Sequence, residues 1–131
     1  MNFVDSSFWI ARFLSQDRRH KEAVDLDRST RTHRLVTSNE ILGETWTFLR
    51  KRTGHERALA WLDGVRRSDV RVDHIDERLE HEAWAWLRVH DERPYSFVDA
   101  TSFALMRKLR IREALAFDGD FAAAGFVELR P

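Results

Sequence analysis

The chain has 131 residues, enough for one domain with a full hydrophobic core and short for two. Charged residues make up 34% of it but cancel to a net charge of +0, so no global field steers it toward nucleic acid or membrane. The absence of cysteine excludes disulfides, thiolate metal sites and cysteine nucleophiles. No segment approaches the ~20 apolar residues of a membrane span, and the N-terminus is unlike a signal peptide. We expect one soluble, cytoplasmic domain over residues 1–131 with no membrane contact.

Five short apolar segments are predicted to be strands, of which the third alternates as an edge strand would. They span residues 3–4, 35–37, 70–72, 114–117 and 126–129. Between them lie segments whose apolar residues recur with helical spacing. Polar residues suited to the N-cap precede these helices, and the candidates are Ser6 or Ser7, Ser38, Asp76 and Ser96. This alternation predicts a three-layer α/β/α domain with a mostly parallel central sheet of four or five strands.

Several acidic residues are placed to meet at one edge of this sheet, because parallel sheets bind ligands at the carboxyl ends of their strands. Asp5 and Asp118 follow the first and fourth strands, and Glu44 and Asp99 lie in early turns of helices that begin near the same edge. Converging carboxylates repel one another unless a cation neutralises them. Mg²⁺ or Mn²⁺ takes such oxygen ligands and promotes in-line phosphoryl displacement. The residues therefore predict a metal site that hydrolyses phosphodiester bonds.

These acids also have purely structural interpretations. Asp5 is suited to cap the helix that follows it. Ser96 and Asp99 have the spacing of a capping box, although Ser96 could cap the helix alone and leave Asp99 free. Asp118 and Asp120 are spaced as in a turn. Asp118 is the better metal candidate because it comes first after the strand, and Asp120 is expected to be a helix cap or an extra ligand.

Glu40 and Glu44 lie on one side of the same predicted helix because they are four residues apart. Glu44 borders the apolar face, so we expect it to be the ligand and Glu40 to be a solvated or supporting acid. The six histidines are scattered in polar segments, which argues against a zinc site. Trp46 and Trp61 fall at helix-face spacing and belong either to the core or to a groove for a partner helix.

The acid pattern resembles that of PIN-domain ribonucleases, specifically the VapC toxins of bacterial toxin–antitoxin pairs. Four segments in order carry the resemblance across almost the whole chain: residues 3–7, 37–45, 95–106 and 116–121. Family members often have Thr at the position of Ser6, a difference that keeps the hydroxyl group. By this resemblance the metal-binding acids are Asp5, Glu44, Asp99 and Asp118, with Ser7 and Asp120 as supporting residues.

The resemblance implies a Mg²⁺- or Mn²⁺-dependent endoribonuclease that cuts structured RNA, either rRNA or tRNA, and so inhibits translation. Residues 43–47 and 95–103 look most like the branch that acts on the sarcin–ricin loop of the large rRNA. The family also implies a homodimer and inhibition by a cognate antitoxin. Two alternatives stay open: a non-catalytic PIN-like RNA-binding protein, and a receiver-like phosphoacceptor. The second fits less well, because two serines rather than a paired acid follow Asp5.

Overall fold

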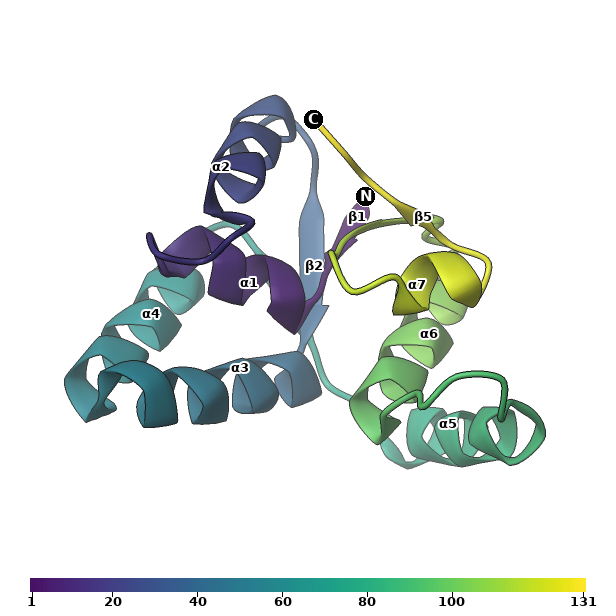
Figure 1. The fold of residues 1–131 in the computed structure, drawn as a ribbon. Coiled ribbons are helices and arrows are strands. Elements are labelled where there is room, and N and C mark those ends of the chain that lie inside the picture. The colour runs from purple at the N-terminus through teal and green to yellow at the C-terminus, as the bar shows by residue number, and fades with distance from the viewer.

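The structure is a computed structural model that describes residues 1–131. A parallel sheet of five strands forms its centre (Figure 1). The strands are β1 (Asn2–Val4), β2 (Leu35–Ser38), β3 (Arg71–Asp73), β4 (Glu113–Leu115) and β5 (Val127–Glu128). Their order is β3-β2-β1-β4-β5, and every neighbouring pair is parallel. The predicted α/β class is therefore confirmed, with β3 at an edge as expected.

Helices cover both faces of this sheet. They are α1 (Ser6–Phe13), α2 (His20–Ser29), α3 (Asn39–Thr53), α4 (His55–Arg67), α5 (Glu77–Val89), α6 (Phe97–Leu109) and α7 (Asp120–Ala123). In Figure 1, α1, α2 and α4 lie to the left of the strands, and α5, α6 and α7 lie to the right. No helix combines the length and the apolar composition needed to cross a membrane.

The central strand β1 is buried on both faces because its successive side chains point to opposite layers. Phe3 belongs to the cluster that contains Phe103 of α6 and Phe121 of α7. Val4 belongs to a second cluster, with Phe8 of α1. This two-sided burial explains why the strand reads in the sequence as an uninterrupted apolar run.

The helix caps agree with the sequence in three cases and differ in one. Ser38, Asp76 and Ser96 each accept a hydrogen bond from the backbone N–H three residues on, as predicted. The first helix is capped by Asp5, so the expectation that Ser6 or Ser7 would be the cap was wrong. The chain is still extended at Asp5, with φ −89° and ψ 162°, and is helical from the next residue.

The order of the strands reverses between β1 and β4. From β1 the chain builds outward to β2 and β3, and it then returns to the other side of β1 to form β4 and β5. Such a reversal leaves a crevice at the carboxyl ends of the two central strands. Asp5 directly follows β1, and Asp118 comes three residues after β4 ends at Leu115. The fold thus brings these two acids to one place.

Candidate active site

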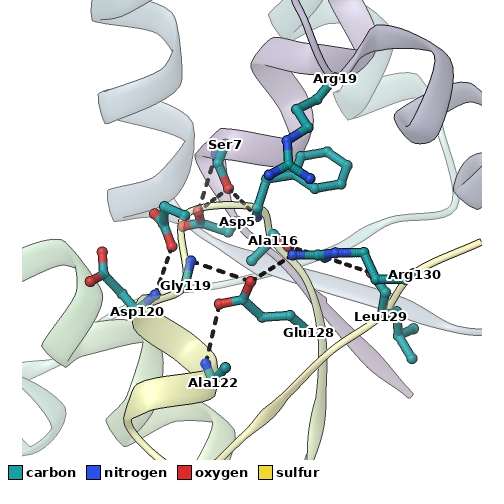
Figure 2. Close-up of polar contacts among 12 residues, drawn as sticks. Asp5, Ser7, Arg19, Ala116, Gly119, Asp120, Ala122, Glu128, Leu129 and Arg130 are labelled. Carbon is teal, nitrogen blue, oxygen red and sulfur yellow. Dashed lines mark hydrogen bonds and ion pairs between the residues drawn. The ribbon is translucent and has the colours of Figure 1, made fainter.

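Asp5 is the most deeply buried acid of the site, with only 1% of the residue exposed. Its Oδ2 accepts hydrogen bonds from the backbone N–H of Ser7 at 3.1 Å and from Ser7 Oγ at 2.6 Å. Ser7 Oγ in turn accepts from the backbone N–H of Phe117 at 3.0 Å, which ties the ends of β1 and β4 together (Figure 2). Burial, and then the charge of Asp118, raises the pKa of Asp5 to about 8.

Asp99 both caps α6 and faces the other acids. Its Oδ2 accepts from the backbone N–H of Ser96 at 3.0 Å, while Ser96 Oγ accepts from the N–H of Asp99 at 2.9 Å. The capping box is therefore present, and the interpretation in which Ser96 caps the helix alone and leaves Asp99 free was wrong. Burial raises the pKa of Asp99 to about 6, against the effect of the cap, and Asp120 and Asp118 add to the rise.

Asp118 and Asp120 complete a close group with Asp99, in which one carboxylate oxygen of each lies within 4.8 Å of the others. Burial raises the pKa of Asp118, and the charge of Asp120 contributes to this shift. Asp120 is not the cap of α7, because Gly119 holds that position with a left-handed φ of 84°. Asp120 is the first residue of the helix, and its backbone N–H donates to Asp118 Oδ1 at 3.1 Å.

Carboxylate oxygens at this spacing suit a hard divalent cation, which takes oxygen ligands and completes its coordination with water or phosphate. Histidine and cysteine, the usual ligands of zinc, are absent from the group. Burial is the main cause of the raised pKa values and repulsion among the acids adds to it, and a cation bound between the acids would relieve that repulsion. The residues present therefore fit Mg²⁺ or Mn²⁺.

Glu44 approaches the site from α3 but lies outside the close group of three acids. Its Oε1 accepts a hydrogen bond from Ser6 Oγ at 2.5 Å, which fixes this exposed side chain against the start of α1. Glu40 is also outside the group. Of the acids predicted from sequence, the structure thus brings Asp99, Asp118 and Asp120 closest together, with Asp5 buried beside them.

Arg93, which sequence reasoning did not single out, is the cation in direct contact with the acids. Its Nη2 and Nε bond to Asp120 Oδ1 at 2.9 and 3.0 Å, and Nη2 also donates to the carbonyl oxygen of Asp118 at 3.4 Å. Arg93 lies in the segment between α5 and α6, in a polar run that reads as an ordinary loop. Nothing in that run distinguishes this arginine from a solvated one.

Glu128 and Arg130 were also missed, although a signal for Glu128 existed. It is an acid within the otherwise apolar segment Phe126–Leu129, where a solvated side chain is not expected. The side chain of Glu128 is only 4% exposed, and it accepts hydrogen bonds from the segment that carries Asp118 (Figure 2).

None of the site acids lines either of two apolar hollows found elsewhere on the surface. A hollow of about 610 Å³ lies between α3, α4 and β3, and Trp46 is among its lining residues. A second, of about 390 Å³, is lined in part by Trp61. Trp46 is partly buried and borders the first groove, whereas Trp61 is 5% exposed and belongs to the core, although it also lines the second groove.

Three comparisons with known proteins agree with this geometry. The model of the PIN domain family matches residues 3–127. The chain is 56% identical over 132 residues to the 23S rRNA-specific endonuclease VapC20 of Mycobacterium tuberculosis, in two strains, covering 100% of this chain and 99% of the relative. The crystal structure of the M. tuberculosis VapC20 toxin, described as cleaving the sarcin–ricin loop, superposes with a TM-score of 0.94 at 53% identity and full coverage of both chains. The chain therefore belongs to the PIN-domain family and, within it, to the VapC branch.

Proposed function

We propose that the chain is an endoribonuclease toxin of a toxin–antitoxin pair, which hydrolyses phosphodiester bonds in structured RNA and so inhibits translation. The observation that carries this proposal is the group formed by Asp99, Asp118 and Asp120, within 4.8 Å of one another at the crevice between β1 and β4. The substrate that we propose is the sarcin–ricin loop of large-subunit rRNA, since the VapC20 relative is described as cleaving that loop.

We propose that Asp5, Asp99, Asp118 and Asp120 hold a divalent cation, Mg²⁺ or Mn²⁺, and that Glu44 contributes from the edge of the site. When bound, such an ion activates water and stabilises the leaving oxygen of a phosphoryl displacement. The protein's own part is to fix the acids through Ser7 and Ser96, whose hydrogen bonds restrict two carboxylates before any ligand arrives.

Arg93 supplies positive charge to the same site. Two of its nitrogens hold Asp120 and the backbone of Asp118, while Nη1 makes no hydrogen bond within the chain. A guanidinium group with a free N–H suits a phosphate oxygen of the substrate. We propose that Arg93 orients the RNA backbone against the acids, which would give a chain of zero net charge a local site for a polyanion.

The proposed partners are RNA and a cognate antitoxin, and we expect a homodimer that acts in the cytoplasm as a single PIN-like domain over residues 1–131. The hollow at α3, α4 and β3 supports a protein partner, because six of its eleven lining residues are hydrophobic. An amphipathic helix buries its apolar face in a groove of this kind. Trp46 is the lining residue that sequence analysis associated with such a groove.

The test is cleavage of a synthetic sarcin–ricin loop RNA by the purified protein with Mg²⁺ or Mn²⁺. We expect one dominant cut that EDTA abolishes and that Asp99→Asn removes. Mapping of RNA 5′ ends after brief expression would locate the cut in cells. RNA binding without cleavage at any metal concentration would support the alternative, a non-catalytic PIN-like RNA-binding protein, and would overturn the proposal.

A further inference from the structure

The loop that carries Asp118 and Asp120 begins where strand pairing ends. Strand β4 stops at Leu115, and α7 begins at Asp120, so residues 116–119 belong to neither the sheet nor a helix, and Ser7 of α1 holds only the N–H of Phe117. The loop turns at Gly119, whose φ of 84° is left-handed. Asp118 projects from this segment and Asp120 from the first residue of α7, and their carboxylates repel each other and Asp99. Its conformation therefore needs support from elsewhere in the chain.

Glu128 of β5 provides part of that support. Its Oε1 accepts from the backbone N–H of Gly119 at 3.3 Å, and its Oε2 accepts from the N–H of Ala122 at 3.1 Å (Figure 2). These N–H groups lie at the start of α7, where no helical carbonyl is available to accept from them. One carboxylate thus holds the backbone on both sides of Asp120.

Arg130 connects this carboxylate to the beginning of the same loop. Its Nη2 lies 3.1 Å from Glu128 Oε1, and its Nη1 donates to the carbonyl oxygen of Ala116 at 2.9 Å. The guanidinium carbon also lies 5.2 Å from the centre of the Phe117 ring. Figure 2 shows Glu128 and Arg130 reaching the loop from the same C-terminal segment. The loop is therefore held at Ala116, Gly119 and Ala122.

We infer that Glu128 and Arg130 are positioning residues, which hold residues 116–122 so that Asp118 and Asp120 stay against Asp99. This inference rests on the proposed metal-dependent function. Neither residue needs to touch metal or RNA to have this effect. Both oxygens of Glu128 accept N–H groups of the protein, and Arg130 donates to Glu128 and to the carbonyl oxygen of Ala116. Loss of a group that orients metal ligands lowers metal affinity, typically by 10- to 100-fold.

Two variants of the full chain, Glu128→Gln and Arg130→Met, distinguish an effect of charge from an effect of positioning. The two explanations predict opposite changes in Mn²⁺ affinity for Arg130→Met. If these residues acted only through charge, Glu128→Gln would weaken Mn²⁺ binding, and Arg130→Met would strengthen it by removing a positive charge. If they position the loop, both variants weaken it. The matched control is Glu113→Gln, which neutralises an exposed carboxylate on β4, in register with the neighbouring strand β5 but outside the loop.

The experiment is calorimetric titration of Mn²⁺ into the metal-free wild type and the three variants, with thermal unfolding of each in EDTA. We expect Mn²⁺ affinity to fall about 10-fold for both Glu128→Gln and Arg130→Met and to stay unchanged for Glu113→Gln. At saturating Mn²⁺ both positioning variants should regain RNA cleavage, with KM for RNA as in the wild type.

Three results would overturn the inference: tighter Mn²⁺ binding by Arg130→Met, affinities equal to wild type in both variants, or a loss of affinity that only follows a loss of folded protein. Arg130 is half-exposed, so its variant is expected to fold even if Glu128→Gln does not. If the wild type itself bound no Mn²⁺, the proposed function would fail first and the inference with it.

Discussion

Ser96 and Asp99 hold each other at the start of α6, because the side chain of each accepts the backbone N–H of the other, at 2.9 and 3.0 Å. Asp99 therefore serves the fold and the acid group at once. An amide oxygen can still accept the N–H of Ser96, so Asp99→Asn should change the free energy of unfolding by less than about 1 kcal/mol. It should lower RNA cleavage by roughly 100-fold or more, since it removes a proposed ligand and not merely its support.

The contrasting variant is Ser96→Ala, which removes the hydroxyl acceptor and leaves all the acids in place. It should destabilise the protein by about 1 kcal/mol and keep its cleavage activity at temperatures where it is folded. Urea unfolding and cleavage assays on the same preparations measure both effects. If Asp99→Asn unfolded, the main role of Asp99 would be to cap the helix. If Asp99→Asn kept full cleavage activity, Asp99 would not be a residue of the active site.

The stability of the metal-free protein should fall as pH rises, because of Asp5. Its pKa is raised from 3.8 to about 8, so between these values the folded protein keeps a proton that the unfolded chain releases. This contribution to stability is fully present below the pKa of Asp5 in the unfolded chain. It is lost as pH rises through the pKa of Asp5 in the folded protein. Asp99, with a pKa raised to about 6, acts in the same direction.

Thermal unfolding in EDTA from about pH 5 to about pH 8 measures this slope. Asp5→Asn should flatten it and raise Tm at the alkaline end, because the amide carries no charge and can still accept from Ser7. Added Mn²⁺ should raise the Tm of the wild type most at high pH, where the acids are ionised. A Tm that does not change with pH would contradict the raised pKa of Asp5.

Arg93→Met should make the protein more dependent on metal for its stability. Without the guanidinium group, Asp120 faces Asp99 and Asp118 with no neutralising partner. We expect only a small loss of stability in EDTA, because the guanidinium group is open to solvent and its ion pair is screened. The rise in Tm on adding Mn²⁺ should be larger than in the wild type. Arg78→Met is the control, since Arg78 is 89% exposed and its partner Glu82 is not part of the acid group. An equal Mn²⁺ response in both variants would exclude this role of Arg93.

Glu44→Gln tests whether the acid outside the close group takes part in the reaction. We expect cleavage to fall by about 10-fold or more, with the free energy of unfolding unchanged because the side chain is exposed. Ser6→Ala should have a smaller effect in the same direction, since the carboxylate remains but loses the bond that orients it. Glu40→Gln serves as the control. Cleavage rates that are equal for the two glutamate variants would assign Glu44 to the solvated surface.

Much of the fold could be predicted because its signals are local. The apolar segments and the caps at Ser38, Asp76 and Ser96 depend on residues within a few positions of one another. The cap at Asp5 was misassigned because three consecutive residues, Asp5, Ser6 and Ser7, are all good N-caps. Only the backbone conformation at the end of β1 distinguishes them.

The sequence by itself determined which acids follow strands and begin helices, since strand–helix alternation and parallel pairing send those positions to one edge of the sheet. The tertiary structure decided which of them meet. Asp120 lies in the close group with Asp99 and Asp118, whereas Glu44 lies outside it and accepts a hydrogen bond from Ser6. It also brought in Arg93, which is 27 residues from Asp120, and Glu128, which is 9 residues from Gly119. Such contacts depend on where loops return to the sheet, and neither periodicity nor capping patterns contain that information.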